Sequence, residues 1–234
     1  MHELTRLGRK YGTDKATTHT FTEKIYGPLL ENRKDTKINL LELGAGRVGG
    51  SHKMWKEYFT RGEIYCLDPF FLPDQKVTIA ELEACGVHVV RGNQLRRDDL
   101  HRIGSAAPEG YDVIIDDAAH MPDAIQLSLA ILFPYLKSGG LYIVEDLATA
   151  ARRGKAWVAT NKNLDSLDSQ KLMTERHVEE YILEEALEHF ETNGEWLTRC
   201  LSVAEGEYLV RNIQQGRIFD DGMRKKNICV IKKK

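Results

Sequence analysis

Two stretches of the sequence end in acidic residues whose types and spacing suit metal chemistry. They are Val113-Ile-Ile-Asp-Asp-Ala-Ala-His120 and Tyr142-Ile-Val-Glu-Asp146, each an apolar run that changes abruptly to acid. Such a run is typical of a buried parallel strand, and ligands of open α/β sheets bind at the carboxyl ends of the strands. We therefore expect four side chains to converge there: Asp117, His120, Glu145 and Asp146.

These residue types favour a hard divalent cation with a base beside it. Carboxylate oxygens select ions such as Mg²⁺, which leaves several coordination positions to water or to vicinal hydroxyls of a substrate. A divalent ion lowers the pKa of a bound hydroxyl, and His120 could then remove the proton. The alternative is that the acids are helix caps and solvated turn residues, with His120 preceding a helix at Pro122. The presence of two such clusters on successive strands favours the metal site.

A glycine-rich loop is the second candidate site. It reads Glu42-Leu-Gly-Ala-Gly46, and Gly44, Gly46 and Gly49 fit the spacing of a dinucleotide fingerprint, which is a weak signal alone. A glutamate before the first glycine suits a cationic amine better than a pyrophosphate. S-adenosylmethionine carries an α-amino group and no phosphate, so the loop favours this cofactor over a dinucleotide.

Polar residues at the ends of the next two predicted strands support this interpretation. Asp68 could accept hydrogen bonds from ribose hydroxyls, and Asn93 and Gln94 could flank the adenine. Alternatively, Asp68 only initiates a turn before Pro69, and the other two are ordinary loop residues. Adjacent acids at a strand end should point in different directions, so Asp116 could serve the cofactor region while its neighbour serves the metal.

The elements that would position these residues alternate between strand and helix. Apolar runs predict strands at 38–43, 64–67, 87–90, 113–115, 141–144 and 227–231, and helical spacing predicts helices at 51–59, 77–85, 98–103, 122–136 and 174–190. This alternation indicates a parallel sheet with helices on both faces. The run 137–140 should end the fourth helix, and the lysines beside the last strand should solubilise a sheet edge. Residues 147–173 are predicted to form a lid or loop.

Composition and charge limit the classes of function. With 234 residues and 42% hydrophobic residues, the chain suits one α/β domain with a proper core. A formal net charge of −2 argues against a general binder of nucleic acid or membrane surfaces. The four cysteines form no CxxC pair, the N-terminus has no apolar signal region, and no long apolar stretch occurs. We therefore expect a cytoplasmic protein with neither a nucleic-acid nor a membrane partner.

Four motifs together resemble one family. They are Tyr11-Gly-Thr-Asp-Lys15 with His19, Leu40-Leu-Glu-Leu-Gly-Ala-Gly46, Asp116-Asp-Ala-Ala-His120 and Gly139-Gly-Leu-Tyr-Ile-Val-Glu-Asp146. The combination is similar to the metal-dependent sugar O-methyltransferases of macrolide biosynthesis, such as the mycinamicin and demethylmacrocin enzymes, and cephalosporin-hydroxylase-like proteins share related motifs. The resemblance covers roughly residues 8 to 146 and the last strand.

The resemblance implies a fold, two cofactors and a set of roles. The fold would be the Rossmann-like, doubly wound, seven-stranded and mostly parallel sheet of a class I methyltransferase, with a cofactor-covering segment at 1–37 and the catalytic domain at 38–234. The activity would be methylation of a sugar hydroxyl, in a natural product or a surface glycan, with S-adenosylmethionine and Mg²⁺. The implied metal ligands are Asp117, Glu145 and Asp146, with His120 as general base. The implied cofactor contacts are Thr13, Glu42, Gly44, Ala45, Gly46, Ser51, Asp68, Asn93, Gln94 and Asp116.

Three departures leave the acceptor and the assembly open. Ala118-Ala119 stands where the family has Gly-Ser, and 147–152 replaces a Thr-Ser-Tyr-like run. The large N-terminal domain of the macrolide enzymes is not expected here, so a homo-oligomer is neither predicted nor excluded. Alternatives to the sugar methyltransferase are a hydroxylase-like or other metal enzyme, a metal-independent methyltransferase, and a non-catalytic cofactor-binding protein.

Overall fold

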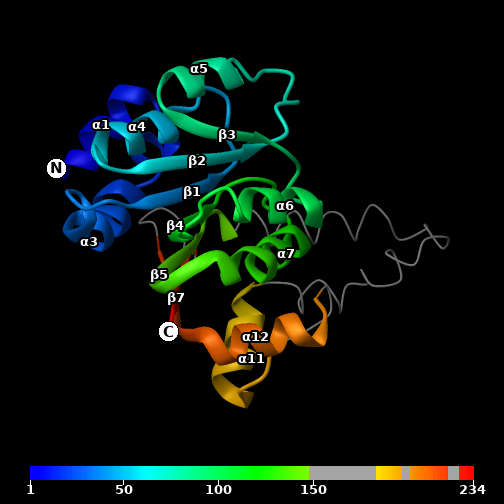
Figure 1. Cartoon of the computed structure of the whole chain (residues 1–234). Helices are drawn as coiled ribbons and strands as arrows, with labels where there is room; N and C mark the ends of the chain where they lie inside the picture. Colours follow the sequence, from blue (N-terminus) through cyan, green and yellow to red (C-terminus); the bar gives the residue numbers. More distant parts are fainter. Residues whose placement is uncertain (148–182, 197–200, 221–226) are drawn as a thin grey trace, which may run out of the picture.

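A seven-stranded sheet forms the centre of the protein (Figure 1). The structure is a computed structural model that describes residues 1–147, 183–196, 201–220 and 227–234. The strand order is β3-β2-β1-β4-β5-β7-β6, parallel except for β7, which is antiparallel to both of its neighbours. The strands are β1 (Asn39–Leu43), β2 (Glu63–Asp68), β3 (Val87–Arg91), β4 (Tyr111–Asp116), β5 (Leu136–Val144), β6 (Ile213–Phe219) and β7 (Ile228–Lys233).

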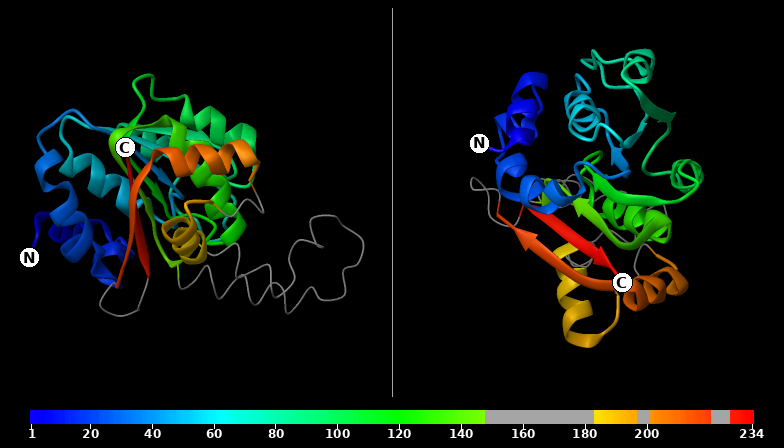
Figure 2. Two further views of the ribbon diagram at one scale, coloured as in Figure 1. Left: turned by 90° about the horizontal axis from the view of Figure 1, so that it is seen from below. Right: turned by 60° about the vertical axis from the view of Figure 1, so that its left-hand side comes forward.

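Helices cover both faces of the sheet, as the sequence predicts. They are α1 (Glu3–Tyr11), α2 (Asp14–Thr17), α3 (Gly27–Leu30), α4 (Gly50–Tyr58), α5 (Ile79–Ala84), α6 (Arg97–Gly104), α7 (Pro122–Leu132), α11 (Leu183–Asn193) and α12 (Val203–Asn212), with short segments η1 (Thr22–Tyr26), η2 (Glu31–Arg33) and η3 (Phe133–Tyr135). Leu40 of β1 packs with α1 and α4, whereas Leu41 and Leu43 pack with α6, α7, α11 and α12. Figures 1 and 2 show these two helical layers on opposite sides of the sheet.

The carboxyl ends of the three central strands lie level with one another. Leu43 of β1 pairs with Asp116 of β4, and Asp116 pairs with Val144 of β5. The backbone N–H of Asp117 donates to Leu43 (3.2 Å), and that of Glu145 donates to Asp116 (3.0 Å). The two acidic stretches therefore leave the sheet side by side, as the sequence predicts.

One predicted boundary is wrong. The helix expected at 122–136 ends at Leu132 and continues as the single turn η3, because Pro134 has no N–H to extend the helical ladder. The run 137–140 lies inside β5 and does not end a helix. The three residues from Tyr111 to Val113 of β4 lie opposite the six residues from Leu136 to Leu141 of β5. The register is therefore irregular there, and Gly139 adopts φ +72°.

The C-terminal region differs most from the predictions. Strand β6 and helix α12 were not expected from the sequence, and β6 occupies the sheet edge. The last strand, β7, therefore lies inside the sheet, and the prediction that its lysines solubilise an edge is wrong. Lys233 is buried, and its ammonium donates to the carbonyls of Phe133, Pro134 and Leu136 at 2.7–3.2 Å.

Part of the sequence lies outside the described residues. The lid predicted at 147–173 lies outside them except for Leu147. The first half of the helix expected at 174–190 also lies outside them. The described second half, α11, packs Leu183 and Leu187 in the cluster that contains α7. Among the described residues, no helix is long and apolar enough to cross a membrane.

Candidate active site

A cavity of about 730 Å³ opens at the carboxyl ends of β1 to β4. It lies where β1 is flanked by β2 on one side and β4 on the other, which is the crevice in which open α/β sheets bind ligands. Eight of the ten predicted cofactor residues line it: Thr13, Gly44, Ala45, Gly46, Ser51, Asp68, Asn93 and Gln94. Two do not, namely Glu42 and Asp116, and both are buried beneath it. Asp117 and His120 also line the cavity.

Backbone geometry explains the first glycine of the loop. Gly44 has φ +92°, and a Cβ atom there would lie 2.3 Å from the carbonyl oxygen of Asp117. The glycine loop and the metal-site segment are therefore in direct backbone contact. Asp68 holds the other side of the loop, since its Oδ2 accepts the N–H of Ala45 at 2.8 Å. Its Oδ1 accepts from the N–H of Phe70 (2.5 Å) and from Gln75 Nε2 (3.1 Å), which leaves Oδ2 with a lone pair for a further donor.

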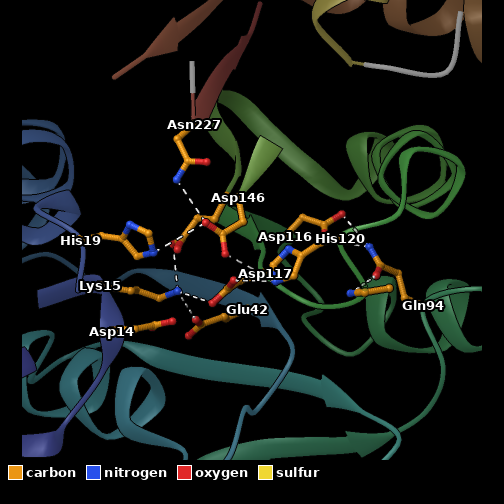
Figure 3. A network of polar contacts seen from close by, with 12 residues as sticks. Asp14, Lys15, His19, Glu42, Gln94, Asp116, Asp117, His120, Asp146 and Asn227 are labelled. Atoms are coloured by element: carbon orange, nitrogen blue, oxygen red, sulfur yellow. Dashed lines mark hydrogen bonds and ion pairs between the residues drawn. The ribbon is translucent and has the colours of Figure 1, made fainter. Parts of the chain in front are cut away.

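A buried lysine connects the three central strands beside this cavity. The ammonium of Lys15 lies 2.5 Å from Asp117 Oδ2, 2.9 Å from Glu145 Oε1 and 3.1 Å from Glu42 Oε1. The ammonium donates a hydrogen bond to Asp117 and forms ion pairs with Glu145 and Glu42 (Figure 3). Glu42, which the sequence assigns to the cofactor's amino group, faces this ammonium in the structure.

Two aromatic side chains complete the shell around the lysine. Trp55 Nε1 donates to Glu42 Oε2 at 2.8 Å, and the Tyr26 hydroxyl donates to Glu145 Oε1. Burial alone would lower the pKa of Lys15, but the charges of Asp117, Glu145 and Glu42 outweigh it and hold that pKa well above its ordinary value. Lys15 therefore acts as a buried counter-ion to these carboxylates.

Three side chains gather in a geometry that fits a divalent cation. One ligand atom each from Asp117, His120 and Asp146 lies within 4.8 Å of the others. His120 Nε2 is 3.7 Å from Asp117 Oδ1 and 3.9 Å from Asp146 Oδ2. With metal–oxygen bonds of about 2.1 Å, ligand atoms of an octahedral shell lie roughly 3 to 4.2 Å apart, so these separations fit.

The backbone at this cluster is strained. His120 has φ +48° and Asp146 has φ +57°, conformations that non-glycine residues rarely adopt. Strain of this kind concentrates at functional sites, where the surrounding structure holds it. Asp146 Oδ1 accepts from Asn227 Nδ2 at 3.1 Å and lies 3.7 Å from His19 Nε2. The residue that precedes β7 and the N-terminal segment therefore both contact this carboxylate.

The structure thus separates the predicted metal ligands. Asp117 and Asp146 lie together with His120, whereas the described oxygen contacts of Glu145 go to Lys15 and Tyr26. Burial raises the pKa of Asp117, with the positive charge of Lys15 opposing the shift. A cation bound at this carboxylate would favour its charged form.

Asp116 points away from its neighbour, as expected for adjacent residues, but toward α7 and not toward the cofactor cavity. Gln94 Nε2 donates to both of its carboxylate oxygens at 2.7 Å, and the Ser128 hydroxyl donates to Oδ2. Burial raises the pKa of Asp116 to about 7, although these hydrogen bonds oppose the shift. Asp116 therefore does not line the cavity but holds Gln94, which does.

Comparison with known proteins finds curated relatives for part of the chain. No protein-family model matches the chain. Mycinamicin VI 2''-O-methyltransferase of Micromonospora griseorubida is 34% identical over 155 residues, covering 63% of this chain and 37% of that protein. Demethylmacrocin O-methyltransferase of Streptomyces fradiae is 35% identical over 156 residues, covering 63% of this chain and 37% of that protein. The chain therefore spans less than half the length of these curated relatives.

A solved structure decides the fold. The MycE methyltransferase of the mycinamycin biosynthetic pathway, in complex with Mg, SAH and mycinamycin VI, superposes with a TM-score of 0.69 and 26% identity, over 99% of this chain and 54% of that one. The fold is that of the class I methyltransferases. The predicted resemblance to sugar O-methyltransferases and the predicted seven-stranded sheet are thereby confirmed.

Some residues of this site were not predicted from the sequence. Lys15 and His19 stood in the motif that carries the resemblance, but no role followed from their pattern. The remaining supports, which no local pattern indicated, are Tyr26, Trp55, Ser128 and Asn227.

The close contact at Gly44 leads to a first prediction. Gly44→Ala should weaken S-adenosylmethionine binding at least about tenfold, because both the positive φ and the contact with Asp117 force the loop to move. Calorimetric titration of the cofactor measures this. Gly139→Ala is the matched control, because Gly139 also has positive φ but has no atom within 4 Å of its added Cβ and lies outside the cavity. Equal cofactor affinity in the two variants would contradict the assignment of the loop.

Proposed function

We propose that this protein is an S-adenosylmethionine- and divalent-metal-dependent O-methyltransferase that acts on a sugar hydroxyl of a glycosylated small molecule. The observation that carries the proposal is the gathering of Asp117, His120 and Asp146 beside a glycine-loop cavity of about 730 Å³. Support comes from the relatives, whose names specify methylation at sugar positions such as 2'' of mycinamicin VI.

The cavity residues would hold the cofactor. S-adenosylmethionine supplies an electrophilic methyl group when bound. The backbone of the glycine loop permits close approach, and Asp68 Oδ2 keeps acceptor capacity for a ribose hydroxyl beside the bonds of this carboxylate to Ala45, Phe70 and Gln75. Gln94 is set apart, because both ends of its side-chain amide are engaged by Asp116 and Ala119. We assign cofactor contacts to the other seven predicted residues that line the cavity. Glu42 and Asp116 are assigned to support, because they are buried beneath it against Lys15 and Gln94 respectively.

Asp117 and Asp146 would hold the metal. A bound divalent ion lowers the pKa of a coordinated hydroxyl, and vicinal hydroxyls of a sugar suit its open positions. His120 Nε2 lies 3.7 Å from Asp117 Oδ1 and 3.9 Å from Asp146 Oδ2, where it would accept the proton of the acceptor hydroxyl. A direct bond from Glu145 to the metal stays a prediction from the sequence.

The N-terminal segment would then be part of the active site and more than a cover. Thr13 lines the cavity, Lys15 holds Asp117, and His19 lies 3.7 Å from Asp146. The proposal includes a cytoplasmic location, which the scattered cysteines favour. It includes no nucleic-acid or membrane partner, in keeping with the net charge of −2. Assembly into a homo-oligomer stays open.

Labelled methyl transfer tests the proposed function. The protein is incubated with methyl-labelled S-adenosylmethionine and a panel of glycosylated macrolides that lack one sugar O-methyl group. We expect label in at least one acceptor, loss of transfer in EDTA, and recovery when Mg²⁺ is added in excess. Full transfer in EDTA would refute the metal requirement. Conversion of an acceptor without transfer of label would instead indicate a hydroxylase-like or other metal enzyme.

A further inference from the structure

Gln94 contacts both the carboxylate of Asp116 and the turn that carries Asp117 and His120. It follows β3 and is 5% exposed. Its Nε2 donates to both carboxylate oxygens of Asp116 (2.7 Å each) and to Ser128 Oγ (3.0 Å). Its Oε1 accepts the backbone N–H of Ala119 at 3.0 Å. Figure 3 shows this side chain against the segment that carries Asp116 and His120.

The segment that Gln94 contacts needs external support. Asp117 and His120, two of the three side chains gathered for a metal, are separated only by two alanines, which have no polar side chain to fix the turn. His120 also has φ +48°, a conformation that persists only where surrounding contacts hold it. The hydrogen bond from the backbone of Ala119 to Gln94 lies between the two metal-site residues and is one such contact.

The anchor of Gln94 is rigid. Asp116 belongs to β4, is 1% exposed, and receives a hydrogen bond from Ser128 of α7. With its amide nitrogen fixed on this carboxylate, the carbonyl oxygen of Gln94 is aimed at Ala119. The side-chain amide of Gln94 thus fixes the turn at Ala119 relative to the end of β4.

We propose that Gln94 is a positioning residue for the metal site, holding the turn from Asp117 to His120 through the backbone of Ala119. This inference rests on the proposed function, because it concerns the same metal. It differs from the sequence-based expectation, in which Gln94 flanks the adenine of the cofactor.

Paired binding measurements separate these two roles. Gln94→Met keeps the length of the side chain and removes both the acceptor and the donor. On the full chain, binding of Mn²⁺ alone is measured by electron paramagnetic resonance, and binding of S-adenosylhomocysteine by calorimetry without metal. We expect Mn²⁺ affinity to fall about ten- to hundredfold, as is typical when a residue that orients a metal ligand is lost, and cofactor-product affinity to stay unchanged.

Ser128→Ala is the matched control. It removes a side-chain donor to Asp116 and an acceptor of Gln94 Nε2, and it leaves the bond between Gln94 and Ala119 in place. Its Mn²⁺ affinity should therefore fall much less than that of Gln94→Met. A loss of Mn²⁺ affinity in Ser128→Ala as large as in Gln94→Met would overturn the proposal. The loss would then be explained by general disturbance of the structure around Asp116.

Two other results would also overturn it. One is unchanged Mn²⁺ affinity in Gln94→Met together with weaker S-adenosylhomocysteine binding, which would make Gln94 a cofactor contact only. The other is unchanged Mn²⁺ affinity in Gln94→Asn. This variant keeps the amide but is too short to reach both Asp116 and Ala119, and it replaces Gln94→Met in the test if the methionine variant does not fold. Absence of Mn²⁺ binding in the wild type would refute the metal part of the proposed function itself, so the two failures are distinguishable.

Discussion

Lys15→Met should lower the free energy of unfolding by about 3 to 5 kcal/mol, because it leaves buried carboxylates without their counter-ion. The ammonium of Lys15 is fully buried and contacts carboxylates from the ends of three adjacent strands. Methionine has a similar volume, so the loss reports the charge and not a cavity. Thermal unfolding should show a fall in Tm on the order of 10 °C.

A surface lysine of the same segment provides the control. Lys10 pairs with Glu57 at 2.5 Å, but both side chains are exposed to solvent. Lys10→Met should therefore leave Tm almost unchanged, since exposed ion pairs contribute little. If Lys15→Met unfolded at the same temperature as Lys10→Met, the buried ammonium could not be the element that holds the N-terminal segment to the sheet.

Asp146→Asn should reduce methyl transfer by about a thousandfold, equivalent to ~4 kcal/mol of transition-state stabilisation. The amide keeps an oxygen for the hydrogen bond from Asn227 and removes the charge that faces His120. Asp146 has no described contact with Lys15, so the fold should persist. Asp117 pairs with Lys15, so a change there would affect both metal binding and stability. A change at Asp146 tests metal binding alone.

The comparison for Asp146→Asn is Asp14→Asn. Asp14 is a carboxylate that lines the same cavity but does not belong to the group that gathers for a metal. Its loss should leave Mn²⁺ affinity unchanged, whereas Asp146→Asn should abolish measurable binding. Equal Mn²⁺ affinity in the two variants would show that the metal is held elsewhere.

The sheet and the convergence of acids could be predicted because both follow from local patterns. A buried parallel strand needs an unbroken apolar run, and the run stops where the strand leaves the core, so the acids at Asp117 and Glu145 mark the strand ends. Level registers between β1, β4 and β5 then bring the ends together.

The direction of each side chain at those ends could not be predicted. The alternation rule for strands fails where the backbone turns, and positive φ at His120 and Asp146 reorients both residues. As a result His120 joins Asp117 and Asp146, while Glu145 faces Lys15. The sequence pattern predicts that these acids lie at one edge of the sheet. It does not show which of them face a metal and which face the ammonium of Lys15.

The role of Lys15 was hidden for a different reason. It lies in a short helix that has no apolar periodicity, and its strand-end partner Asp117 is 102 residues further along the chain. Only the assembled tertiary structure brings them together. Likewise, Lys233 looked like an edge lysine because β6, which covers that side of β7, has an irregular pattern broken by Gly216.

The central claim is that the cavity ends in a metal site formed by Asp117, Asp146 and the neighbouring His120. Anomalous diffraction from crystals grown with Mn²⁺ and S-adenosylhomocysteine tests it most directly. The account predicts one anomalous peak within bonding distance of the carboxylates of Asp117 and Asp146. No peak there at saturating Mn²⁺, or a peak only at another site, would contradict it.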